Sequence, residues 1–156
     1  MKRREFITLL GGAAAAWPLA VRAQQPERMR RIGVLMNLAA DDPLAQARNA
    51  ALLQGLQELS WTVGRNVQIE YRWGAEAAGR NREYAAELVA LAPDVLVSGG
   101  GSPGLSALQQ ATSTVPIVFV AIVDPVGQGF VESLARPGGN TTGFTIFEYG
   151  ISGKWF

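Results

Sequence analysis

The run Pro116-Ile117-Val118-Phe119-Val120-Ala121-Ile122-Val123-Asp124-Pro125 decides the fold class of this chain. Seven apolar residues stand between a proline and an Asp-Pro pair, with no alternation between apolar and polar side chains. Continuous apolar strands of this kind are typical of parallel sheets that are covered on both faces. The sequence therefore predicts a buried strand over residues 117–123 in an α/β protein.

The Asp124-Pro125 pair belongs to a pattern that also includes Asp42-Pro43 and Ser102-Pro103, each of which follows an apolar run. Each pair predicts the start of a helix, because the capping oxygen accepts a free backbone N–H and proline has no N–H to lose. In parallel sheets such turns gather at the carboxyl ends of the strands, where open sheets bind their ligands. Small-molecule binding is therefore the first functional hypothesis.

The spacing of apolar residues extends this pattern along the chain. It predicts strands over residues 31–36, 67–73, 94–98, 117–123 and 142–147, and helices over residues 43–59, 81–92, 103–113 and 126–134. Strands that alternate with helices in this way indicate a doubly wound parallel sheet with right-handed crossovers. We expect the strand order 2-1-3-4-5.

The first 23 residues predict an export signal. Lys2-Arg3-Arg4 gives a basic twin-arginine start, residues 7–21 form an apolar stretch, and Ala23 precedes a predicted cleavage site. The apolar run is shorter than a membrane-spanning helix requires. We therefore expect a periplasmic protein that is cleaved near Ala23 and begins with a polar leader over residues 24–30.

The composition excludes several kinds of chemistry. The 156 residues include neither cysteine nor histidine, which leaves no thiol nucleophile, no Ser-His pair and none of the usual zinc ligands. Without residues 1–23, ten basic and twelve acidic residues remain, and they form no basic stripe. We therefore expect no nucleic-acid partner, no catalysis, no cofactor and no metal.

Six runs of residues carry a resemblance to a known family. They are Val63-Gly64-Arg65-Asn66-Val67-Gln68-Ile69-Glu70-Tyr71-Arg72, Ala85-Ala86-Glu87-Leu88-Val89, Pro93-Asp94-Val95-Leu96-Val97, Pro116-Ile117-Val118-Phe119, Asp124-Pro125-Val126 and Ser133-Leu134-Ala135-Arg136-Pro137-Gly138-Gly139-Asn140-Thr141-Thr142-Gly143. In this order they resemble the ABC-transporter substrate-binding proteins of the tryptophan/tyrosine-type uptake systems. The resemblance spans nearly the whole chain after residue 23.

The resemblance implies a soluble extracytoplasmic receptor with the type I periplasmic binding protein-like fold. Two α/β lobes of such a receptor close on a ligand, which is then delivered to a membrane permease driven by an ATPase. The family is about twice as long as this chain, so we expect residues 31–149 to form the N-terminal lobe. Residues 150–156 resemble the start of a missing second lobe, which implies a truncated receptor.

The candidate binding residues lie in the predicted turns. Gly100, Gly101 and Ser102 open the helix after the third strand and could receive a carboxylate at its N-terminus, or simply form the turn and its cap. Asp124, next to Pro125, could accept a ligand ammonium or cap its own helix. Together these two turns would suit a zwitterionic amino acid or a short peptide. Three more candidates follow other strands, namely Asn37, Leu38 and Phe147.

Two other functions stay open at this point. The pattern Gly99-x-Gly101-x-x-Gly104, with Asp124 twenty residues further on, fits a dinucleotide-binding oxidoreductase. However, that pattern normally follows the first strand of its domain, whereas here it follows the third and contains Pro103. A ligand-sensing domain of a signalling protein is the other alternative. Trp61 and Trp73 are interpreted as packing residues rather than as an aromatic ligand box.

Overall fold

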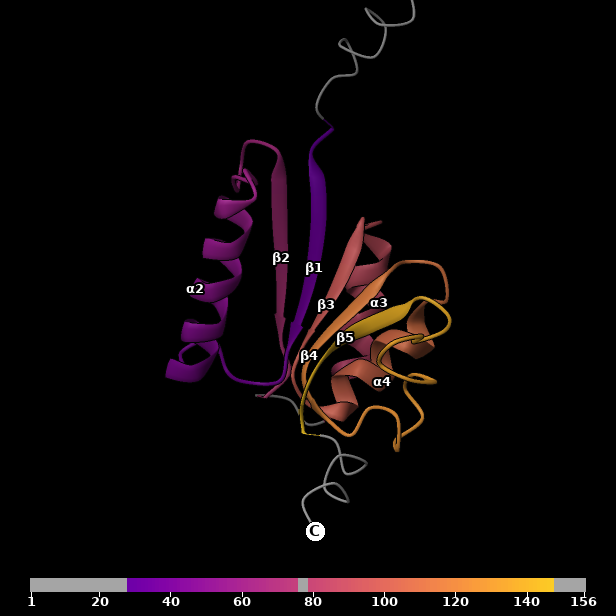
Figure 1. Cartoon of the computed structure of the whole chain (residues 1–156). Coiled ribbons are helices and arrows are strands. Elements are labelled where there is room, and N and C mark those ends of the chain that lie inside the picture. The colour runs from indigo at the N-terminus through magenta and orange to yellow at the C-terminus, as the bar shows by residue number, and fades with distance from the viewer. Residues whose placement is uncertain (1–27, 76–78, 148–156) are drawn as a thin grey trace, which may run out of the picture.

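Five parallel strands form one sheet in the order β2-β1-β3-β4-β5 (Figure 1). The structure, a computed structural model, describes residues 28–75 and 79–147. The strands are β1 (Arg30–Met36), β2 (Val67–Trp73), β3 (Val95–Gly99), β4 (Ile117–Val123) and β5 (Thr141–Phe147), and the helices are α2 (Pro43–Glu58), α3 (Asn81–Ala90) and α4 (Ser102–Ala111). The predicted fold class and strand order are therefore confirmed.

The helices divide between the two faces of the sheet. Helix α2 packs through Ala45, Leu52 and Leu56 on one face, over β1 and β2, whereas α3 and α4 cover the other face. The core under α3 and α4 is built on fully buried side chains such as Leu96 and Phe119. None of the helices in the described residues is long and apolar enough to cross a membrane.

The start of α2 confirms one of the three predicted caps. The Oδ1 atom of Asp42 accepts hydrogen bonds from the backbone N–H groups of Leu44 at 2.7 Å and Ala45 at 3.3 Å. Pro43 follows as the first helical residue. The cap thus satisfies donors that would otherwise have no partner, as the Asp-Pro pattern predicted.

The predicted helix over residues 126–134 is wrong. After β4 the chain makes a single helical turn that ends at Gly129, whose φ is +76°. The N–H of Phe130 donates to the carbonyl of Pro125, and the N–H of Gly129 donates to that of Val126, both at 2.9 Å. This is the hydrogen-bond pattern that closes a helix at a left-handed glycine, so the chain continues to β5 through turns.

The two faces of β4 and β5 differ in how they are covered. On one face, the inward residues of β4 and β5 lie under α4. On the other face, which α2 covers at β1 and β2, no described helix lies over β4 and β5. Phe144 and Ile146 point to that open face and are 73% and 67% exposed. Contrary to the expectation for an apolar strand, no helix among the described residues covers this face at β4, although Val118 and Val120 of β4 are partly buried.

Asp94 connects the amino ends of β1 and β3, and it gives the fold a specific pH dependence. The pKa of its carboxyl lies below the ordinary value, because the backbone N–H of Arg31 donates to Oδ2 at 2.9 Å and the Arg30 guanidinium donates to Oδ1 at 2.8 Å. A carboxyl with a lowered folded-state pKa stabilises the fold above its unfolded pKa of about 3.9, and this contribution is lost as the pH falls through the folded pKa.

We expect Asp94→Asn to lower the free energy of unfolding by about 1 kcal/mol at pH 7, since the carboxylate is near the surface and partly screened by water. The difference from the wild type should shrink as the pH falls below the unfolded pKa of about 3.9 and through the lowered folded pKa. Urea unfolding between pH 2 and pH 7 measures it, with Asp41→Asn as the control at an exposed carboxylate. A difference that stays constant down to pH 2 would contradict the assignment.

Candidate functional site

The candidate site lies at the carboxyl edge of the sheet, where β1 and β3 end side by side and the neighbouring β4 runs further, to Val123. Met36 at the end of β1 pairs with Gly99 at the end of β3, and β4 is the next neighbour of β3. The turns that follow these strands therefore lie at one edge, at the lower end of the sheet in Figure 1. All of the candidate residues belong to these turns or to the end of β5.

Gly100 and Gly101 form the centre of this edge, and both have left-handed backbones with φ values of +105° and +78°. The side chain of Asn37 lies directly against them. A Cβ atom on Gly100 would lie 2.9 Å from Asn37 Oδ1, and one on Gly101 would lie 3.1 Å from Asn37 Nδ2. The sequence-predicted residues Asn37, Gly100 and Gly101 are therefore brought together, in space that only glycine leaves open.

The start of α4 differs from the predicted cap. Gly101 holds the N-cap position, Ser102 is the first helical residue, and no side chain caps this helix. Ser102 therefore does not supply its hydroxyl to the helix end, and the first N–H groups of α4 have no side-chain acceptor. Helix N-termini of this kind favour a bound anion, because their free N–H groups and the helix dipole both attract negative charge.

Arg48 is the residue at this edge that the sequence analysis missed. It lies in the second turn of α2, and its Nη1 donates to the carbonyl oxygen of Gly99 at 3.0 Å and to Asn37 Oδ1 at 3.5 Å. The side chain is half-buried. Its position three residues after the buried Ala45 was a usable signal, since residues at this spacing share a helix face.

Asp124 and Pro125 occupy the turn after β4. Asp124 has a φ of +45°, and its Oδ1 accepts a hydrogen bond from the N–H of Gly127 at 3.0 Å. The carboxylate thus caps the single turn that follows, which agrees with the simpler of its two predicted roles. Pro125 is fully buried. A contact between Asp124 and a ligand stays a prediction.

Leu38 lies in the turn after β1, and Phe147 lies at the end of β5. Leu38 is half-buried and packs against the core beneath α2. Phe147 is the last residue of β5 and pairs with Val123 at the end of β4, which places its backbone at the same edge of the sheet. Their roles in binding also stay predictions.

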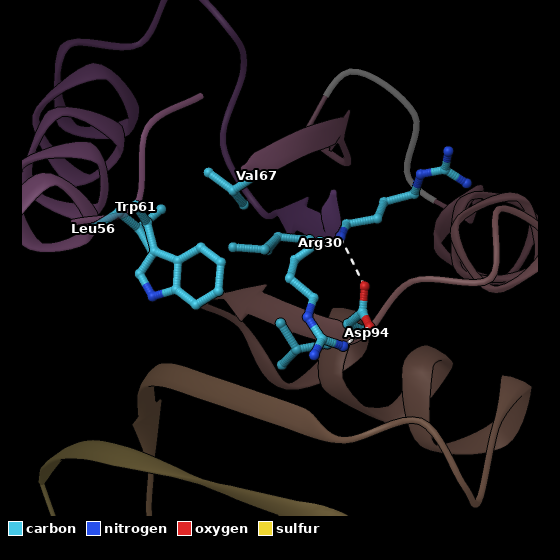
Figure 2. Close-up of a pocket in the computed structure, with 8 residues that line it drawn as sticks. Arg30, Leu56, Trp61, Val67 and Asp94 are labelled. Carbon is cyan, nitrogen blue, oxygen red and sulfur yellow. Dashed lines mark hydrogen bonds and ion pairs between the residues drawn. The ribbon is translucent and has the colours of Figure 1, made fainter. Parts of the chain in front are cut away.

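A pocket of about 450 Å³ lies at the opposite, amino end of the strands (Figure 2). Trp61 and Leu56 stand on one side of it, and the ion pair between Arg30 and Asp94 stands on the other. Trp73, in contrast, stacks on Tyr71 with ring centroids 5.5 Å apart and packs against the core under α2. The packing role that the sequence predicted for Trp73 is thus confirmed, whereas Trp61 also forms a pocket wall.

Comparisons with known proteins give the family. The family model described as "ABC transporter substrate binding protein" matches residues 31–148. A tyrosine-binding protein from Clostridioides difficile (strain R20291) is 26% identical over 117 residues, which are 75% of this chain and 33% of that protein.

Two solved structures have the same fold. A conserved domain protein from Vibrio cholerae O1 biovar El Tor has a TM-score of 0.71 and 30% identity, over 82% of this chain and 42% of that one. An ABC domain from Streptococcus pneumoniae in complex with L-Trp has a TM-score of 0.67 and 28% identity, over 74% of this chain and 38% of that one. This chain thus spans well under half the length of these relatives. Because the family model covers most of its residues, the chain belongs to the ABC transporter substrate-binding protein family.

Proposed function

We propose that this chain is the N-terminal ligand-binding lobe of a solute receptor for an ABC uptake transporter, and that its solute is an amino acid. The observation that carries the proposal is the convergence of Asn37, Gly100 and Gly101 at the carboxyl edge of the sheet. Relatives described as binding tyrosine and L-Trp support an aromatic amino acid as the ligand. The family assignment also favours binding over the nicotinamide-dependent chemistry that the glycine pattern allowed.

In this proposal each candidate residue meets one part of the ligand. The uncapped start of α4, with Gly100, Gly101 and Ser102, receives the carboxylate. Asp124, on the adjacent turn, accepts the ammonium group, and Pro125 holds that turn in the core. Asn37 adds a polar contact. Leu38 provides an apolar wall, and Phe147, at the end of β5, reaches the ligand or the hinge.

The cellular setting follows from the family, whose members work outside the cytoplasm. We propose that residues 1–23 direct twin-arginine export to the periplasm, with cleavage near Ala23 and residues 24–30 as a leader. Residues 31–149 then form one lobe, and residues 150–156 begin a second lobe that closes on the ligand before delivery to the permease. Residues 1–27 and 148–156 lie outside the described residues, and the relatives' greater length supports the second lobe.

A thermal melt of residues 24–156 tests this function. A ligand that binds only the folded state raises the midpoint of unfolding. We expect L-tyrosine or L-tryptophan at millimolar concentration to raise it by a few degrees, whereas nicotinamide dinucleotides and D-glucose should not. A shift with dinucleotides alone would contradict the receptor function and favour the oxidoreductase alternative.

A further inference from the structure

Two hydrogen bonds hold the guanidinium of Arg48 at the candidate site, and both are made by the same side of the guanidinium. Both contacts, to the carbonyl oxygen of Gly99 and to Asn37 Oδ1, use the single nitrogen Nη1. A guanidinium carries five N–H donors in a planar fork. The Nε and Nη2 donors of Arg48 meet no acceptor among the described residues and stay available for a further partner.

The charge of Arg48 is also without a counter-charge in the described ranges. The four ion pairs found in residues 28–75 and 79–147 involve Arg28, Arg30, Arg72 and Arg80, but not Arg48. Arg48 is nevertheless half-buried between α2 and the end of β3. A cation that is partly withdrawn from water is stabilised when an anion binds beside it.

Gly100 lets the Arg48 guanidinium approach the backbone after β3 closely. A Cβ atom on Gly100 would lie 2.8 Å from Arg48 Nη1, so the guanidinium lies directly over this glycine. The next residue, Gly101, is the N-cap of α4 and leaves that helix without a side-chain cap. The guanidinium thus lies over the residue that precedes the N-cap of α4, and both the guanidinium and the helix N-terminus attract a negative charge.

We infer that Arg48 binds the carboxylate of the ligand, an inference that rests on the proposed amino-acid-binding function. The Nε and Nη2 donors take the two carboxylate oxygens in the paired geometry that arginine prefers, while Nη1 stays on the carbonyl of Gly99. The first N–H groups of α4 complete the coordination of the carboxylate. The lobe thereby selects ligands with a free carboxylate over their amides and esters.

The test compares ligands that differ only at this group. L-tyrosine, L-tyrosinamide and 4-hydroxyphenylacetate are titrated into residues 24–156, and affinities are measured by calorimetry and by midpoint shifts. We expect L-tyrosine to bind at least about tenfold more tightly than L-tyrosinamide, as a charge-assisted hydrogen bond implies. Arg48→Gln should abolish this preference and Arg48→Lys should keep part of it. Arg65→Gln, at an exposed arginine of the turn before β2, is the matched control and should keep all of it.

A purely structural role for Arg48 predicts a different result. Arg48→Gln would then lower the affinity for L-tyrosine and L-tyrosinamide equally, or leave the preference intact, and either result would overturn the inference. If Arg48→Gln does not fold, the wild type provides the test instead. The NMR signal of the Arg48 Nε–H group is then followed while each ligand is added. It should shift with L-tyrosine and 4-hydroxyphenylacetate but not with L-tyrosinamide.

The remaining outcomes separate this inference from the proposed function. If 4-hydroxyphenylacetate binds in an Arg48-dependent manner but no amino acid binds, the carboxylate site stands and the amino-acid ligand is wrong. If L-tyrosine binds without shifting the Nε–H resonance, the function stands and the role of Arg48 is wrong. If none of the carboxylate probes binds, the inference is overturned.

Discussion

Phe119→Ala is expected to lower the free energy of unfolding by about 3–5 kcal/mol, the usual cost of truncating a buried phenylalanine. Phe119 has no exposed surface and lies in the middle of β4, within the core beneath α4. The substitution removes its buried apolar area and leaves a cavity that the surrounding strands cannot fill. Urea unfolding measures the loss as a lower midpoint at an unchanged slope.

Phe144→Ala is the matched control, because Phe144 belongs to the adjacent strand but is 73% exposed on the open face. Phe144→Ala should change the free energy of unfolding by no more than about 0.5 kcal/mol, as most surface substitutions do. If Phe119→Ala leaves too little stability to measure, Phe119→Leu gives a smaller loss in the same direction. Equal costs for Phe119→Ala and Phe144→Ala would contradict the assignment of the two faces.

Gly100→Ala is expected to weaken amino-acid binding while the chain stays folded. The new Cβ atom would lie within 2.9 Å of Arg48 Nη1 and Asn37 Oδ1, so the ends of both side chains must shift away from their present positions. The backbone at Gly100, with a φ of +105°, adds strain of about 1–3 kcal/mol for an alanine. Calorimetric titration with L-tyrosine measures the loss of binding, and urea unfolding measures the strain.

Gly64→Ala separates the effect of backbone strain from the effect of displacing the Arg48 and Asn37 side chains. Gly64 also has a left-handed backbone, with a φ of +83°, but a Cβ atom there would meet no other atom within 4 Å. It should therefore show the backbone strain without any loss of affinity. Similar affinities for L-tyrosine in the two variants would mean that the site does not lie at Gly100.

The sheet could be predicted from the sequence because its signals are local. The apolar runs, the Asp42-Pro43 cap and the right-handed crossover rule were enough to give the strands and their order. The helix over residues 126–134 failed because its apolar spacing was given more weight than Gly129, which ends the chain's single turn. The open face of β4 could not be foreseen, since an apolar strand does not show which segment covers it.

The candidate site was predictable only in part. The glycines after β3 and the turn after β4 were found because strand ends and capping residues are visible in the sequence. Arg48 was missed because its contact with Gly99 joins positions 51 residues apart. Its spacing from the buried Ala45 indicates a shared helix face but does not identify Gly99 as the partner. The role of Ser102 was misplaced by one residue, because Gly101 takes the cap position through a left-handed backbone.

The central claim is that the ligand binds at the carboxyl edge of the sheet, and chemical-shift mapping tests it most directly. The backbone amides of residues 24–156 are followed by NMR while L-tyrosine is added. We predict that the largest shifts occur at Asn37, Leu38, Gly100, Gly101 and Ser102, with smaller shifts at Asp124. Shifts centred on the pocket beside Trp61 and Asp94, at the other end of the strands, would contradict the account, as would the absence of shifts with any amino acid.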